Sequence, residues 1–212
     1  MGLTFKKHYI LFFILFISWA GALFIKAESR HTATLQEGIA SEIIRFHVIA
    51  NSDSKEDQDL KYKVKEALVE ELSPILCKAS DITEGRSLIK SKFSSIQTLA
   101  DKVISQNGYS YAVSVSLEFI YFPMKVYGEF SFPPGIYEAL NVRIGEAKGQ
   151  NWWCIMFPPL CFVDETYSIV NSDSEEQLEL LLTEEEYEAI KSKKVPVKYK
   201  FKLWKTIKKL FS

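Results

Sequence analysis

Few residues of this chain have a type and spacing that could support catalysis. The histidines are His8, His31 and His47, and the first two lie in or directly after an apolar N-terminal segment. Only His47 is placed to act within a folded domain. A zinc site is not expected, because structural zinc needs four nitrogen or sulfur ligands and catalytic zinc usually needs three protein ligands. The sequence predicts no metal, no cofactor and no small-molecule substrate.

Common catalytic motifs are missing as well. The sequence has no glycine-rich phosphate loop, no nucleophile elbow and no Cys-x-x-Cys pair. Acidic residues are numerous, but none falls in a pattern that indicates a cleft. A nucleophilic pair of Cys154 with His47 is disfavoured, because Cys154 follows two tryptophans and precedes Ile-Met-Phe, where burial would raise the pKa of a thiol. We therefore expect no catalytic residue and no enzyme.

The three cysteines allow at most one intrachain disulfide. Cys154 and Cys161 are separated by Ile-Met-Phe-Pro-Pro-Leu, and the two prolines could turn the chain back, whereas Cys77 is remote. Outside the cytoplasm these two residues can close a small disulfide loop. A pair of free buried thiols is the alternative, and the sequence leaves both open.

Length and composition predict one globular domain. The chain has 212 residues, of which 47% are hydrophobic and 14% aromatic, so a sizeable core is available. Lys and Arg number 26 against 27 Asp and Glu, which gives a net charge of -1. Without a basic field to hold a phosphate backbone, nucleic acid is not an expected partner.

Residues 1–30 are predicted to be a signal peptide or a signal anchor. The run from Tyr9 to Ile25 is uncharged and follows Lys6 and Lys7, an arrangement that favours export over a buried core helix. The run is at the lower edge of the about 20 apolar residues that a spanning helix needs. An Ala-x-Ala-like site predicts cleavage after Ala22, but cleavage and anchoring both stay open. The rest of the chain should lie outside the cytoplasm.

The exported part begins with a predicted strand over 43–50. Alternation places Ile44, Phe46 and Val48 on one face and Arg45, His47 and Ile49 on the other. Ser54 and Asp57 have the spacing of a capping box, in which the carboxylate returns to the cap amide. A helix is expected from Lys55 to about Leu72, ending near Pro74, with Lys61 facing water.

The remaining elements complete an α+β fold. We expect one helix over 83–106, stopped by Asn107-Gly108, and then a strand over 111–120. Apolar runs over 125–132, 137–145 and 151–157 predict further strands, the last two joined by a hairpin loop at 146–150. The predicted domain spans 37–192, with a largely antiparallel sheet and helices packed on one face.

The C-terminal region divides by charge. Residues 164–188 hold ten acids and no Lys or Arg, whereas residues 191–212 hold nine lysines and no acid. Aromatic and aliphatic residues in the second part recur every three to four positions, which predicts a basic amphipathic tail over 193–212. This tail either packs on the sheet or contacts an anionic membrane surface or acidic partner through 198–212.

Several unusual strings resemble the stage II sporulation protein R family. They are Arg-Phe-His-Val-Ile-Ala-Asn-Ser-Asp-Ser at 45–54, Arg-Ile-Gly-Glu at 143–146, Asn-Trp-Trp-Cys at 151–154 and Phe-Pro-Pro-Leu-Cys at 157–161. The resemblance covers roughly residues 37–162 and the signal. It implies a signalling protein that is made in the forespore of an endospore-forming bacterium and exported into the space between the two septal membranes.

The resemblance also implies a partner. Members of the family trigger a membrane-embedded aspartic protease of the mother cell, which then removes the pro-sequence of a sigma factor. No catalytic residue is assigned to the signal protein itself. The candidate partner contacts in this chain are Arg45, His47, Asn51, Ser52, Asp53, Arg143, Asn151, Trp152 and Trp153.

Two classes of function remain open from the sequence. A signalling ligand would present exposed residues, foremost Arg45 and Asp53, whereas the segment 51–54 could equally be a helix cap and turn. An exported hydrolase acting on cell wall would instead gather Arg45, His47, Asp53 and Asn151 around a pocket. Trp152 and Trp153 are adjacent on a strand, so they should point to opposite faces of the sheet.

Overall fold

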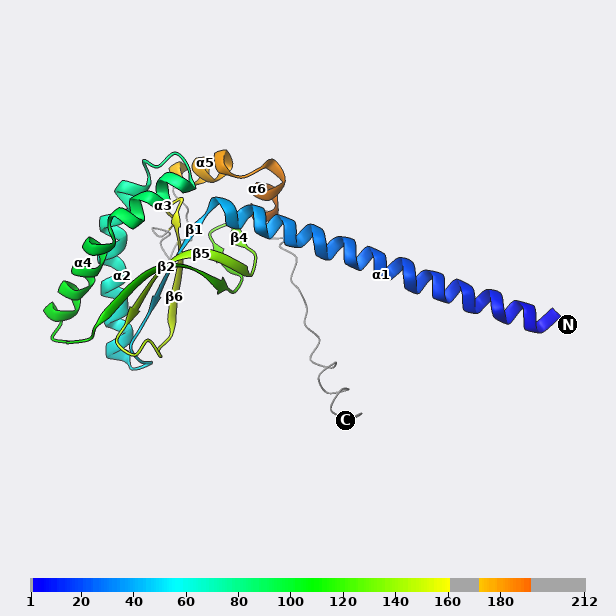
Figure 1. Ribbon diagram of the computed structural model, residues 1–212, viewed down its shortest axis with the longest axis horizontal. Coiled ribbons are helices and arrows are strands. Elements are labelled where there is room, and N and C mark those ends of the chain that lie inside the picture. Colours follow the sequence, from blue (N-terminus) through cyan, green and yellow to red (C-terminus); the bar gives the residue numbers. More distant parts are fainter. Residues whose placement is uncertain (1, 161–171, 192–212) are drawn as a thin grey trace.

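The computed structural model describes residues 2–160 and 172–191 and forms an α+β domain from which one long helix projects (Figure 1). The helices are α1 (Gly2–Glu42), α2 (Lys55–Leu76), α3 (Ile82–Ser91), α4 (Phe93–Gln106), α5 (Ser172–Leu181) and α6 (Glu184–Lys191). The strands are β1 (Ile44–Ile49), β2 (Val113–Phe122), β3 (Lys125–Tyr127), β4 (Phe130–Phe132), β5 (Gly135–Ile144) and β6 (Asn151–Phe157).

The main sheet has four strands in the order β2-β5-β1-β6. β1 runs parallel to β5 and antiparallel to β6, and β2 runs antiparallel to β5. β3 and β4 form a separate antiparallel hairpin. The predicted fold class, α+β with a largely antiparallel sheet, is confirmed.

The predicted hairpin between β5 and β6 is wrong, because β1 lies between these two strands. β1 is buried along nearly its whole length, as a central strand covered on both faces must be. The 146–150 loop therefore crosses the end of β1 instead of turning tightly, and it bonds to the backbone there. Lys148 N donates to Asn51 O at 3.1 Å, and Gly149 N donates to Ala50 O at 3.0 Å.

The larger core lies between the sheet and helices α2, α3 and α4, which Figure 1 shows on one side of the sheet. Ile44, Phe46 and Val48 project into this core and are fully buried. The alternation predicted for the first strand is thus confirmed. Leu68 of α2 and Ile96 of α4 are among the helix residues that pack against them.

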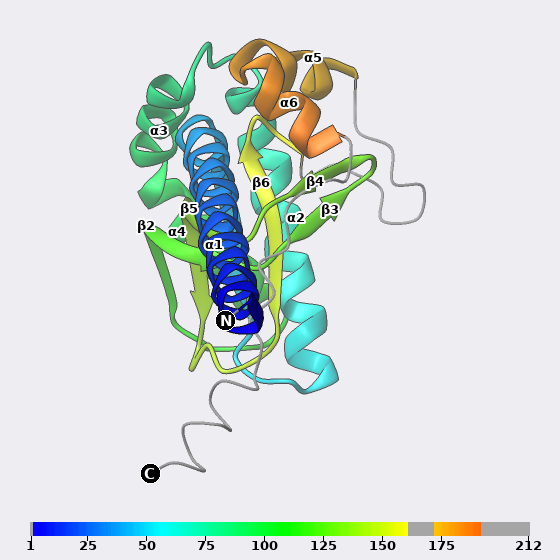
Figure 2. The ribbon, with the colours of Figure 1, turned by 90° about the vertical axis from the view of Figure 1, so that its right-hand side faces the viewer.

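A second core lies on the opposite face of the sheet. There the end of α1, the β3–β4 hairpin and the helices α5 and α6 pack together (Figure 2). Ile39 of α1, Phe132 of β4 and Ile190 of α6 are all buried in it. This second core fixes the root of the projecting helix to the sheet.

Two helix predictions are corrected by packing. α2 continues through Pro74 to Leu76, because Leu76 is buried in the larger core while Pro74 is exposed. Lys61 was expected to face water but is buried. Its ammonium group donates to Gln58 Oε1 at 2.6 Å and to Gln150 O at 3.3 Å, which compensates the lost hydration.

The single helix expected over 83–106 is divided into α3 and α4. Lys92 leaves helical geometry with φ -100° and ψ 1°, and it separates the two. Asp81 caps α3 by accepting a hydrogen bond from Glu84 N at 2.8 Å. The predicted stop at Asn107-Gly108 is confirmed, since Gly108 adopts φ +83° directly after α4.

The N-terminal segment is one uninterrupted helix, α1, that continues into the domain. Many of its apolar side chains, such as Phe12, Trp19 and Phe24, are largely exposed. Among the helices of the described residues, none is both long and apolar enough to cross a membrane. The prediction that residues 1–30 form a signal or anchor is not tested by these observations and stays a prediction.

Candidate functional site

The sequence-predicted contact residues fall into two groups in the structure. Asn51, Ser52 and Asp53 lie in the turn after β1, at the end of the sheet that the 145–150 loop crosses. The others lie on the sheet itself, on β1, β5 and β6. They are Arg45, His47, Arg143, Asn151, Trp152 and Trp153.

The segment 51–54 acts as a clamp on the 145–150 loop, and we call it the 51–54 clamp. Asn51 Oδ1 accepts a hydrogen bond from Glu146 N at 2.9 Å. Asp53 Oδ1 accepts one from Gln150 N at 2.7 Å, directly before β6 begins. These side chains hold the loop that carries the chain from β5 over to β6, so the polarity of the motif has a structural reason.

The carboxylate of Asp57, in the first turn of α2, fixes two side chains of the clamp. Its Oδ2 accepts hydrogen bonds from Asn51 Nδ2 at 2.8 Å and from Ser52 Oγ at 2.5 Å. Burial alone would raise the pKa of the Asp57 carboxyl, but hydrogen bonds, that from Ser52 foremost, outweigh burial and hold this pKa below its usual range. The carboxylate is thus kept charged at neutral pH.

The capping box is confirmed only in part. Ser54 Oγ accepts from Asp57 N at 3.2 Å, as an N-cap should. The carboxylate of Asp57 does not return to the amide of Ser54, because it is occupied by Asn51 and Ser52. The Ser54 amide donates instead to Ser52 Oγ at 3.2 Å.

Two glycines let the clamp and the loop approach closely. Gly145 adopts φ +58°, and a Cβ there would collide with the Asn51 side chain. A Cβ on Gly149 would collide with the main-chain carbonyl of Ser52, which cannot move aside as a flexible side chain could. The loop sequence is therefore fitted to the clamp at both positions.

His47, Arg143, Asn151 and Trp153 share the face of the sheet opposite α2–α4. In register, His47 lies beside Trp153, and Ile49 lies between Arg143 and Asn151. The His47 ring stacks on Trp153 with 3.9 Å between centroids and 8° between planes. His47 itself is buried. The structure thus brings these four candidate contacts together on one face of the sheet, but only part of the group is accessible.

His47 is held neutral at physiological pH. Burial, followed by the charge of Arg143, lowers the pKa of His47 to about 4, although the Asn151 side chain and the Glu118 charge act in the opposite direction. Neither ring nitrogen has a hydrogen-bond partner with good geometry within the described part of the chain. A general base needs such a partner or a reachable substrate proton, so His47 is poorly placed for hydrolysis.

Arg45 was expected to be exposed, and this expectation is wrong. Its guanidinium group is fully buried and lies 4.2 Å from the centroid of the Tyr137 ring and 4.8 Å from that of Phe122. Phe132 is a third ring, at 5.3 Å. No guanidinium nitrogen has a well-formed hydrogen bond to any described residue, and the nearby Tyr137 hydroxyl donates its proton to Pro133 O. Aromatic faces therefore supply the main stabilisation of this charge.

The residues proposed for a hydrolase do not converge. Arg45 is enclosed by aromatic rings, His47 stacks on Trp153, and Asp53 belongs to the clamp beyond the end of β1. The charged residues that act on His47 are Glu118 and Arg143, whose half-exposed side chains form an ion pair of 2.6 Å. Asn141 Nδ2 donates to the same carboxylate oxygen.

The two tryptophans point to opposite faces, as their adjacency predicted. Trp152 packs against the larger core and meets Phe46 edge-on at 5.7 Å. Trp153 packs against the second core beside His47 and Phe122. Both indoles are half-buried, so neither is a freely exposed anchor in the described structure.

The cysteine predictions are only partly covered. Cys77 is a free cysteine and is exposed as a residue, but partial burial of its thiol, followed by the Asp173 charge, raises the pKa of the thiol. Cys154 is disulfide-bonded. Cys161 lies outside the described residues, so its pairing with Cys154 stays a prediction. The same holds for the predicted basic tail over 193–212.

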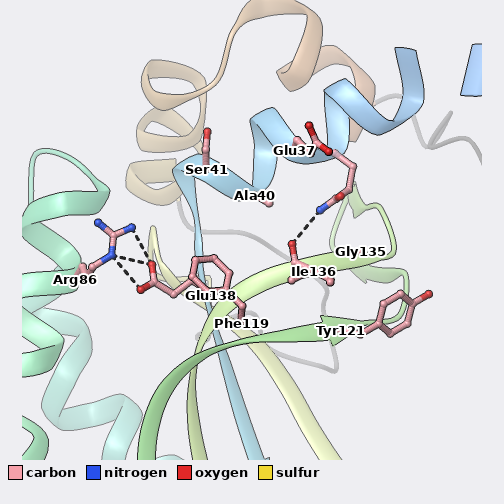
Figure 3. Close-up of a pocket in the computed structure, with 10 residues that line it drawn as sticks. Glu37, Ala40, Ser41, Arg86, Phe119, Tyr121, Gly135, Ile136 and Glu138 are labelled. Carbon is pink, nitrogen blue, oxygen red and sulfur yellow. Dashed lines mark hydrogen bonds and ion pairs between the residues drawn. The ribbon is translucent and has the colours of Figure 1, made fainter. Parts of the chain in front are cut away.

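Sequence reasoning missed a groove at the free edge of the sheet. It lies beneath the last turns of α1, over the ends of β2 and β5, and encloses about 760 Å³ (Figure 3). Phe119, Tyr121 and Ile136 line it and are largely exposed. At one end Arg86 Nε donates to both carboxylate oxygens of Glu138, at 3.0 and 2.8 Å.

The alternation in β2 explains why the groove was missed. Phe119 has the same parity as Val113, Val115 and Leu117, which pack on the larger core, so alternation alone does not indicate that Phe119 is exposed. The twist of the sheet carries the end of this long strand away from the helices, so residues of the same parity become exposed. The sequence offered one sign of this exposure. The alternating apolar run of β2 is longer than the helices packed on it can cover.

Comparisons with known proteins agree with the resemblance noted above. A family model described as stage II sporulation protein R matches residues 40–167. The stage II sporulation protein R of Bacillus subtilis (strain 168) is 36% identical over 163 residues, which are 75% of this chain and 72% of that protein. No solved structure is detectably similar to the chain.

Gly149→Ala should destabilise the domain by roughly 2–3 kcal/mol, because its methyl group would collide with a backbone carbonyl in a packed turn. Gly108→Ala is the control. Unlike Gly149, Gly108 is at positive φ, but the new Cβ has no atom within 4 Å, so only about 1 kcal/mol of backbone strain is expected. Urea unfolding measures both, and equal losses would contradict the clamp.

His47 should make stability depend on pH. Between pH 6.5 and about 4 the unfolded chain binds a proton that folded His47 excludes, so the free energy of unfolding should fall on acidification. The loss should reach about 3 kcal/mol. His47→Phe keeps an aromatic ring against Trp153 and should lack this dependence in the same window. Identical pH profiles of the two proteins, measured by urea unfolding, would refute the assignment.

Proposed function

Because this chain belongs to the stage II sporulation protein R family, we propose that it is an exported signal between the two cells of a sporulating bacterium. Its role in sporulation follows from the family. The proposal adds that the protein activates a membrane-embedded aspartic protease of the mother cell, which then processes a sigma-factor precursor. The observation that carries it is the family match across residues 40–167.

The described structure supports a binding role over a chemical one. Its polar motif at 51–54 is used to hold a loop, Arg45 is enclosed by aromatic rings, and His47 is buried and neutral. Phe119, Tyr121 and Ile136 form an exposed apolar surface that is not part of the buried core. Exposed apolar clusters of this kind mark surfaces that meet other proteins.

Export is proposed through the apolar segment of α1. The segment carries exposed aromatic and aliphatic side chains between Phe12 and Ile25, preceded by Lys6 and Lys7. The protein would then act in the space between the forespore and mother-cell membranes, either cleaved or N-terminally anchored. Contact of the 198–212 tail with a membrane surface remains part of this proposal.

Co-expression in a non-sporulating host tests the activation. Cells receive this protein, the family's membrane protease and the sigma precursor, and an immunoblot follows precursor cleavage. We expect cleavage only when all three are present, because the signal acts through the protease. A form lacking residues 1–30 should remain in the cytoplasm and give none. Cleavage without the protease, or none with all three, would disprove the proposal.

Asp53 remains a candidate contact, and a conservative change separates its two roles. Asp53→Asn keeps an oxygen that can accept from Gln150 N but removes the charge, so the melting temperature should change little. Asp53→Ala loses this hydrogen bond, at about 1 kcal/mol. If the outward charge contacts the protease, both variants should reduce cleavage several-fold. Normal cleavage with Asp53→Asn would leave Asp53 a purely structural residue.

A further inference from the structure

We propose that the free edge of β2 and the groove beneath α1 receive an extended segment of the membrane partner, which adds to the sheet as a fifth strand. This inference rests on the proposed function and names the surface through which it operates. The expected occupant alternates apolar side chains and carries a basic residue. Strand addition to an exposed edge is a common mode of peptide recognition.

The edge of β2 offers the backbone complement for such a segment. β2 pairs with β5 along its full length, from Val113 opposite Ile144 to Phe122 opposite Gly135. Its other edge carries no strand among the described residues. Only its beginning is capped there, since Gln97 Nε2 from α4 donates to Val113 O at 2.5 Å. Unpaired main-chain groups beyond that point can be satisfied by a further strand.

The floor of the groove offers apolar contacts at the same place. Phe119, Tyr121 and Ile136 are 70%, 64% and 59% exposed, and Tyr121 lies directly opposite Ile136 in the sheet. The apolar surface continues along the chain to Met124 and Val126, which are also exposed. Side chains at alternate positions of an added strand would cover these rings and remove them from water.

The walls of the groove are already formed. Gln36 Nε2 donates to Ile136 O at 3.2 Å and ties the last turns of α1 to β5. The doubly bonded Arg86–Glu138 pair closes the other end, as Figure 3 shows. A volume of about 760 Å³ lies within the range of sites that hold several side chains of a ligand. Binding would thus require little rearrangement.

The charge of the groove selects a basic segment. Arg86 is neutralised by Glu138, whereas Glu37 on α1 is exposed and has no ion pair with any described residue. A lysine or arginine opposite Glu37 would complete the groove electrostatically. The only charged residue of β2 is Glu118, so a second copy of this chain pairing through β2 would bring no basic residue to Glu37. An anionic lipid surface would be repelled by Glu37 and could not pair with the strand edge.

The same co-expression assay tests the groove with targeted variants. Phe119→Ser combined with Tyr121→Ser should reduce precursor cleavage at least about tenfold, because the two aromatic rings form the floor of the groove and aromatic residues are enriched at the centre of interfaces. Glu37→Lys should reduce cleavage roughly three- to tenfold. Leu180→Ser, which removes an exposed apolar side chain of α5 that does not line the groove, should remain within about twofold of the unchanged protein. Thermal melting must confirm that every variant is folded.

A physical measurement separates this inference from the proposed function. In the complex copurified with the protease in detergent, backbone amides on the outer edge of 115–122 should exchange hydrogen more slowly than in the free protein. If the unchanged protein triggers cleavage but these amides exchange as before, or the folded double variant is fully active, the groove proposal is wrong and the function stands.

Other occupants give distinct results. A dimer seen by sedimentation and abolished by the double variant would make the edge an interface between copies. Binding to vesicles of phosphatidylglycerol and phosphatidylethanolamine that the double variant weakens would make it a lipid surface. Either result overturns the proposal. If the unchanged protein triggers no cleavage, the proposed function fails and the groove inference falls with it.

Discussion

The fold depends on the insertion of β1 between β5 and β6, and this insertion depends on how the 145–150 loop is held. β5 and β6 are consecutive in the chain, so the loop between them must pass over the end of β1. Asn51 and Asp53 make this passage possible by accepting hydrogen bonds from amides of the loop. Asp57 in turn fixes Asn51 through a carboxylate that its hydrogen bonds keep charged and in place despite burial. One polar cluster thereby sets the order of the sheet.

The order of the sheet then decides the environment of the polar residues on β1. A central strand is covered on both faces, so Arg45 and His47 are buried despite their chemistry. The protein accommodates the first charge with three aromatic rings and the second group by keeping it neutral. Arg45 and His47, two of the residues considered for a hydrolase, therefore lie buried on the second-core side of the sheet, whereas the outer strand β2 carries an accessible apolar surface.

The sequence predicted the local features of this fold better than their assembly. Periodicity identified β1 and both faces of it, and the stop at Gly108 followed from glycine geometry. The pairing of β1 with β6 could not be read, because a loop of hairpin length is compatible with a hairpin and with a crossing. The burial of Arg45 and Lys61 was not predicted either, because it depends on contacts with segments that are distant in the sequence. The exposure of Phe119 depends on twist, which alternation does not encode.

The unbroken course of α1 would set the range over which the proposed signal can act. Gln36, at the rim of the groove, lies eleven residues after Ile25, a rise of about 16 Å at 1.5 Å per residue. A helix retained at the membrane would act as a stiff spacer that holds the groove at this height and fixes its direction. The groove could then contact only partner segments that extend to that height beside it. Cleavage after Ala22 would remove the tether and turn a contact signal into a diffusing one.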